Sequence, residues 1–206
     1  MSAVGTQNAA RQRLRSAGSL SGPVLAMCSL LFAAAADAAE PSLASQVKAA
    51  CIVNFVRFVD WPEDAFRSAS DPIVIGILGG DPYQGAMEST ATDKEIHGRK
   101  LIVKRLQNTD LAKGVHVLII GNVGREECAA TVAKLRASPV LTISDAGDFM
   151  KCGGAVRFFE SEGKVRFEIN PEAAKRSKLR VSSKLLKLAA IYRVENTDSS
   201  ASETKE

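Results

Sequence analysis

The chain has 206 residues, of which 27 are lysine or arginine, 23 are aspartate or glutamate and 46% are hydrophobic. This length suits one ordinary domain with a sizeable core. The net charge of +4 falls to +2 without residues 1–38, which hold three arginines and one aspartate. A nearly neutral chain implies neither nucleic acid nor an anionic membrane surface as a partner.

The first 38 residues are typical of a cleavable secretory signal peptide. Three arginines between residues 11 and 15 precede the apolar run Val24–Ala36, and Ala36-Asp37-Ala38 offers a cleavage site. The apolar run is shorter than the roughly 20 residues that a membrane-spanning helix needs. We therefore expect cleavage and a periplasmic location, with a retained anchor or lipid attachment at Cys28 as alternatives.

The next hundred residues alternate between helix and strand patterns, as in parallel crossover units. Three of the expected strands are almost entirely apolar, which is typical of strands buried on both faces of a sheet. In chain order we expect a helix over Leu43–Val59, a strand over Ile73–Leu78, a short helix from Asp81 to about Thr90, strands over Leu101–Leu106 and Val115–Ile120, a helix over Arg125–Ala137 and a strand over Val140–Ile143.

The last third changes to a hairpin followed by short helices. Ala155–Phe159 and Lys164–Ile169 read as strands joined by a turn. Helices are expected from Pro171 and over Lys184–Val194. The predicted fold is an α/β three-layer sandwich, with a mixed, mostly parallel sheet of about six strands, helices on both faces and a C-terminal β-hairpin. The domain should span residues 39–194, after the signal peptide 1–38 and before a disordered polar tail, 195–206.

A ligand crevice is possible at the carboxyl edge of this sheet, where open α/β sheets bind ligands. Gly79, Gly80 and Asp145 are the candidate residues. The glycines match neither G-x-G-x-x-G nor G-K-[ST], and Asp81 is better explained as a helix N-cap with Pro82 at the first helical position. A periplasmic small-ligand-binding sensor module coupled to another signalling protein is therefore the second functional interpretation.

The remaining polar residues indicate no catalytic or metal centre. His97 lies in a loop and His116 in a buried strand, and neither accompanies a nucleophile motif. No C-x-x-C pair or cysteine–histidine cluster is present. We expect a protein that is not an enzyme and holds no cofactor or metal.

Three cysteines follow the expected cleavage site. Cys51 and Cys128 fall on the apolar sides of predicted helices and should be buried. Cys152 lies in a loop beside Gly153-Gly154 and is the candidate redox or disulfide-forming thiol. The odd number permits at most one internal bridge.

Several short segments, spread over nearly the whole expected domain, are informative when they are compared together with known families. They are, in order, Val47–Ala50, Asn54–Pro62, Ile75–Gly79 with Asp81-Pro82, Val117–Ile120, Pro139–Asp145, Gly153-Gly154, Val165–Asn170 and Leu179–Leu186. Together they resemble the YfiR-like family of periplasmic proteins. The resemblance implies a regulator that binds the sensory domain of an inner-membrane diguanylate cyclase, represses it and so lowers cyclic di-GMP and biofilm formation.

The resemblance also implies homodimers and a second partner, an OmpA-like peptidoglycan-associated lipoprotein that sequesters the repressor. It implies redox sensitivity through disulfides, as in the best-known member. Only Cys152 lies where such a cysteine is expected, because the strands at Ile75 and Val117 lack one.

The resemblance and the charged hairpin together give the candidate partner-binding residues, which are Phe167, Glu168, Asn170 and Arg180. Mixed charge on a hairpin is commonly a solvated edge, and it is also how a protein contact is steered. Asn170 has an alternative role as the cap of the helix at Pro171.

Overall fold

The computed structural model describes residues 40–109 and 113–193. The chain divides into two units, 1–38 and 39–206, and every described residue belongs to the second. The predicted signal peptide, with Cys28, and the predicted polar tail lie outside the described residues.

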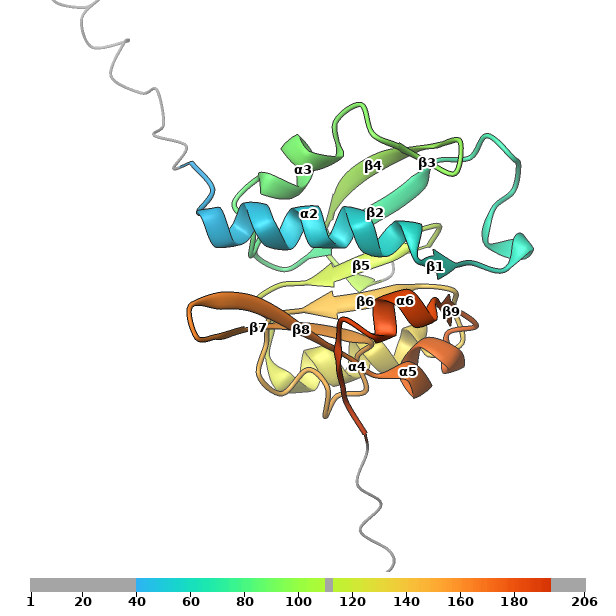
Figure 1. The fold of residues 1–206 in the computed structure, drawn as a ribbon. Coiled ribbons are helices and arrows are strands. Elements are labelled where there is room, and N and C mark those ends of the chain that lie inside the picture. Colours follow the sequence, from blue (N-terminus) through green and yellow to red (C-terminus); the bar gives the residue numbers. More distant parts are fainter. Residues whose placement is uncertain (1–39, 110–112, 194–206) are drawn as a thin grey trace, which may run out of the picture. The chain divides into compact units, whose positions relative to one another are not determined.

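A mixed eight-stranded sheet forms the centre of the fold (Figure 1). The strand order is β10-β8-β7-β6-β5-β2-β4-β3; the pairs from β4 to β7 are parallel, and β8 returns antiparallel to β7 as the predicted hairpin. The strands are β2 (Ile73–Leu78), β3 (Glu95–Ile96), β4 (Arg99–Leu106), β5 (Val117–Ile120), β6 (Leu141–Ser144), β7 (Val156–Ser161), β8 (Lys164–Ile169) and β10 (Ala190–Ile191). Six of these are the expected strands; the prediction of about six omitted β3 and β10, which are too short to show an alternating pattern.

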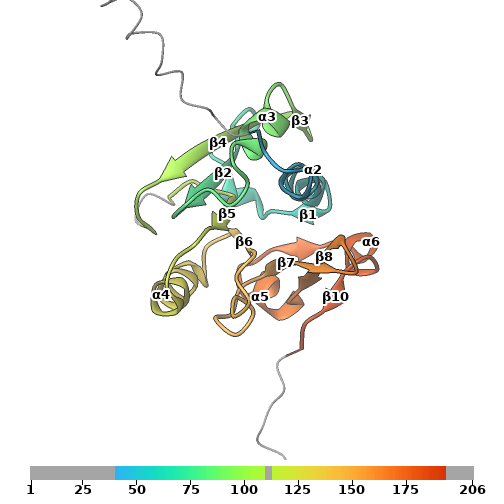
Figure 2. The same cartoon turned by 90° about the vertical axis from the view of Figure 1, so that its left-hand side faces the viewer.

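Helices cover the sheet because its strands carry apolar side chains on both faces. Along β2, Ile73, Ile75 and Ile77 join the core under α2 and α3, whereas Val74 and Leu78 join a second core under α4. Figure 2 shows α2 and α4 on opposite sides of β5. The helices are α2 (Leu43–Arg57), α3 (Ala86–Ala91), α4 (Arg125–Leu135), α5 (Pro171–Arg176) and α6 (Ser183–Leu186), with a 3₁₀ turn η1 at Glu63–Ala65.

The first helix ends two residues earlier than predicted because the residues that follow it form a strand of a small second sheet. Phe58 leaves the helical conformation, and β1 (Val59–Asp60) pairs antiparallel with β9 (Arg180–Val181). The Ser182 amide also donates to the Phe58 carbonyl at 2.8 Å. This pairing joins the two ends of the domain.

Two other helix predictions are wrong in their limits. Asp81 does not cap a helix; its carboxylate accepts from the amides of Tyr83 and Gly85, both at 2.8 Å, which closes a turn before α3 begins at Ala86. The expected closing helix stops at Leu186 as α6, because Ile191 then pairs with Ile169 at the sheet edge.

Candidate functional site

The residues of the predicted crevice, Gly79, Gly80 and Asp145, lie at the carboxyl edge of the sheet, where other side chains of the domain contact Asp145. Asp145 follows β6, and its two carboxylate oxygens accept from the Lys48 ammonium at 2.7 Å and the Tyr83 hydroxyl at 2.9 Å. Burial raises the pKa of Tyr83, and the adjacent Asp145 charge adds to this, so the hydroxyl stays protonated as the donor. Asp145 therefore joins α2 to the β2–α3 turn.

The glycines at this edge permit close packing of two loops. A Cβ added to Gly121 would lie 1.8 Å from the Gly80 carbonyl oxygen, so the loops after β2 and β5 touch backbone to backbone. Gly79 adopts φ +80°, a left-handed conformation that glycine accepts without strain. Gly79 and Gly80 therefore allow a tight turn after β2 and its close packing on the loop after β5.

Replacing Asp145 by alanine should lower the free energy of unfolding by about 2 kcal/mol, because it leaves the mostly buried Lys48 ammonium and the Tyr83 hydroxyl without their acceptor. Urea unfolding measures this. Asp148→Ala is the matched control, since its ion pairs with Arg125 and Lys151 are solvent-exposed. Equal losses in the two variants would contradict the role given to Asp145.

The β7–β8 hairpin has one face packed against α2 and one partly exposed face. Phe158 and Phe167 face α2 and contact Phe55, with ring centroids 5.7 and 4.8 Å away. On the other face the cross-strand partners are Arg157 with Glu168 and Phe159 with Arg166. We call this second face the charged hairpin face; its residues are Arg157, Phe159, Lys164, Arg166 and Glu168.

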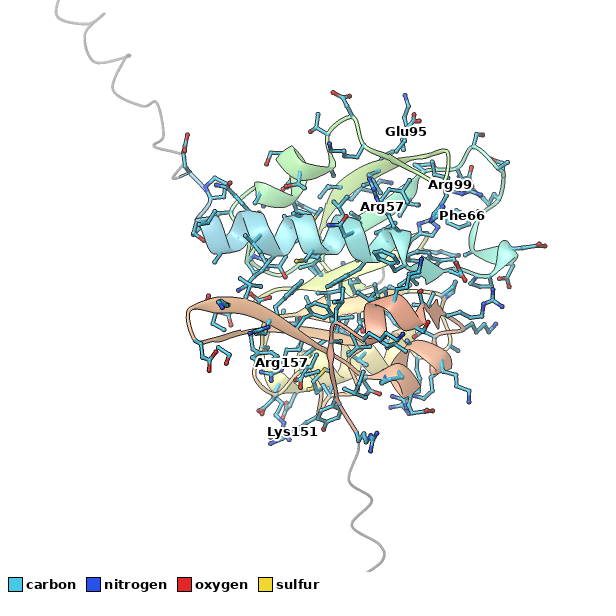
Figure 3. The ribbon with its side chains drawn as sticks, viewed as in Figure 1. Arg57, Phe66, Glu95, Arg99, Lys151 and Arg157 are labelled. Atoms are coloured by element: carbon cyan, nitrogen blue, oxygen red, sulfur yellow. The ribbon has the colours of Figure 1, made fainter. Side chains whose placement is uncertain are left out.

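An ion pair orders the charged hairpin face. Arg157 Nε donates to Glu168 Oε1 across the strands, and both side chains are largely buried. The Arg157 guanidinium also lies 5.3 Å from the Phe159 ring centroid. Figure 3 shows Arg157 on this hairpin. An aromatic ring flanked by arginines is a common centre of a protein–protein contact.

The other two predicted partner residues lie elsewhere. Asn170 is 1% exposed, and its Oδ1 accepts from the Ala173 amide at 3.0 Å, so the alternative role as the cap of α5 is the one the structure supports. Arg180 on β9 pairs with Asp60 of β1 at 3.3 Å, and both side chains are exposed. Such a pair contributes little to stability. The structure therefore separates the four residues, and Glu168 alone lies on the charged hairpin face.

A family model described as YfiR/HmsC-like (DUF4154) matches residues 45–190. This chain belongs to the YfiR/HmsC-like family. The resemblance carried by its sequence segments is thereby confirmed. The family is one of periplasmic regulators of cyclic di-GMP signalling, and the match runs from Ser45 in α2 to Ala190 in β10 and includes the charged hairpin face.

One solved structure similar to this YfiR/HmsC-like chain is a conserved domain protein from Vibrio cholerae O1 biovar El Tor. The TM-score is 0.49 at 11% sequence identity, over 72% of this chain and 60% of that chain. This chain thus spans less than two thirds of the length of that protein.

The cysteines of this YfiR/HmsC-like domain are all free thiols. Burial raises the pKa of Cys128 to about 12, and a hydrogen bond with Cys152 adds to this. Cys152 Sγ also lies 3.9 Å from the Arg125 carbonyl oxygen, one turn before Cys128 on α4. Sequence spacing did not reveal this neighbour of Cys152, because the two residues come from separate elements.

The two histidines have structural positions. His97, with φ 54°, and Gly98 form the two-residue turn between β3 and β4. His116 is buried: its Nδ1 accepts from the Val74 amide at 3.1 Å, and its Nε2 lies 3.1 Å from the Ala65 carbonyl. These partners fix the neutral tautomer with the proton on Nε2. Within residues 40–109 and 113–193, no group of three potential ligands could hold a metal ion.

The domain should become less stable below pH 6.5 through His116. Burial lowers the pKa of this imidazole in the folded chain, and Arg99 adds to this. Its contribution is therefore complete above the unfolded pKa of about 6.5 and is lost as the pH falls through the folded pKa, at up to about 1.4 kcal/mol per pH unit. Urea unfolding of wild type and His116→Gln at pH 7.5, 6 and 5 measures it. If the difference in free energy of unfolding between wild type and His116→Gln stayed the same at all three pH values, His116 would not be the cause of the pH dependence.

No helix in the described part of the chain is long and apolar enough to cross a membrane.

Proposed function

We propose that this YfiR/HmsC-like protein is exported to the periplasm, binds the sensory domain of an inner-membrane diguanylate cyclase and represses it, so that cyclic di-GMP and biofilm formation stay low. The match of the family model over residues 45–190 is the observation that carries this proposal. The signal-peptide pattern of residues 1–38 supports export.

The charged hairpin face is our proposed contact with the cyclase. Its basic side chains outnumber its single acid, so the complementary surface on the partner should be acidic. Phe159 is half-buried beside Arg157 and can enter a pocket on the partner, whereas Phe158 is committed to the core. Rigid β-strands hold these side chains in place before binding, which lowers the entropic cost of association.

The same proposal includes a homodimer and an OmpA-like peptidoglycan-associated lipoprotein that competes for the repressor. Neither partner needs a catalytic group on this chain. Binding alone accounts for the regulation, because a ligand that prefers the inactive form of the cyclase shifts the population towards it.

A pull-down from detergent-solubilised inner membranes tests the proposed contact. The exported form of the protein should retain a diguanylate cyclase, identified by mass spectrometry. Arg166→Glu reverses an exposed charge on the charged hairpin face and should lower the recovered cyclase at least tenfold. Lys175→Glu makes the same charge change on α5 and should leave recovery unchanged. Recovery without any cyclase, or equal recovery by both variants, would overturn the proposal.

A further inference from the structure

An open groove of about 420 Å³ lies at the amino ends of β2 and β4, on residues that the proposed cyclase contact does not use. The segment between β1 and β2 forms most of it, and Arg99, the first residue of β4, closes one side. Figure 3 shows Phe66 and Arg99 next to each other. The lining residues are Trp61, Pro62, Glu63, Phe66, Ser68, Ala69 and Arg99.

Arg99 is held firmly yet keeps donors for a ligand. Its Nη1 donates to the carbonyls of Ser68 at 2.9 Å and Asp71 at 2.7 Å. Its Cζ lies 3.8 Å from the Phe66 ring centroid, a stacked cation–π contact. Both hydrogen bonds use Nη1, so Nε and Nη2 keep their protons for an acceptor from outside the described chain.

The aromatic walls of the groove are fixed from behind. Phe66 stacks on His116 with centroids 4.3 Å apart and 13° between the planes. Trp61 Nε1 donates to the His116 carbonyl at 3.3 Å. His116 is itself held by two backbone groups, so both rings have a set position before any ligand arrives.

We propose that this groove binds a small aromatic monocarboxylate. A flat ring suits walls made of indole and proline groups, and the free edge of a stacked guanidinium pairs with a carboxylate through two donors. Glu63 at the groove disfavours a second negative charge on the ligand. In this proposal the small-ligand site lies at the amino edge of the sheet, opposite the carboxyl edge where the sequence predicted a crevice.

Trp61 is the single tryptophan of the chain, so its fluorescence reports on the groove directly. Titration of the protein with phenylacetate should give a saturable change in Trp61 emission and a raised melting temperature. Acetate lacks the ring and benzyl alcohol lacks the charge, so each should bind at least tenfold more weakly. A phenylacetate titration that matches acetate would overturn the proposal.

Substitutions distinguish phenylacetate binding in the groove from nonspecific binding elsewhere on the protein. Arg99→Gln should weaken phenylacetate binding at least tenfold, and Ala69→Leu should do the same by filling the groove while leaving Arg99 in place. Arg67→Gln is the charge-matched control, because Arg67 is 95% exposed and outside the lining, and its binding should equal wild type. Wild-type binding by both groove variants, or an equal loss in Arg67→Gln, would overturn the assignment. The proposed cyclase contact can fail without affecting any of these results.

Discussion

Replacing Gly121 by alanine should lower the free energy of unfolding by about 3 kcal/mol. The new methyl group would lie 1.8 Å from the Gly80 carbonyl oxygen, which belongs to the backbone of the neighbouring loop and cannot turn away as a side chain would. Overpacking of this kind forces backbone shifts in a dense core. Chemical denaturation gives the loss directly.

Gly124→Ala is the matched control for this substitution. Gly124 follows the same strand and has no atom within 4 Å of an added Cβ. Its φ of −61° suits alanine, so the change should cost only about 0.5–1 kcal/mol, from the poorer N-cap of α4. Similar stabilities for the two variants would show that the two loops do not touch as described.

Truncating Phe158 to alanine should cost about 4 kcal/mol, because the ring is fully buried and joins the hairpin to α2 through Phe55. Phe159→Ala, the next residue on the opposite face, should cost about 1 kcal/mol. Thermal and urea unfolding of the two variants measures the difference.

The variants Phe158→Ala and Phe159→Ala also distinguish an effect on stability from an effect on cyclase binding. Phe159→Ala should fold normally and recover less cyclase in the pull-down, because Phe159 lies on the charged hairpin face. If Phe159→Ala were as destabilising as Phe158→Ala, the two faces of the hairpin would be assigned incorrectly.

The sheet was largely predictable from sequence because burial leaves a local pattern. β2 is an unbroken apolar run in the chain and is buried at all six positions. The end of α2 was not predictable, since Val59 leaves the helical pattern to pair with Val181 near the other end of the chain. Two-residue strands such as β10 leave no periodicity that a sequence window can detect.

The candidate site was predictable only in part. The family-like segment named Glu168 as a candidate, and its cross-strand neighbour Arg157 lies close in sequence. The groove was missed because Trp61 and Arg99 are far apart in the chain and join only when the loop before β2 folds over the start of β4. For Asn170 the sequence allowed two roles, a partner contact or a helix cap. The structure supports the cap, because the residue is buried and its side chain accepts from the first turn of α5.

The cellular level of cyclic di-GMP tests the central claim most directly. In a strain lacking the gene, the level should rise severalfold; the wild-type protein should restore it, and Arg166→Glu exported to the same amount should not. An unchanged level after deletion, in cells shown to express the protein, would contradict the repressor function.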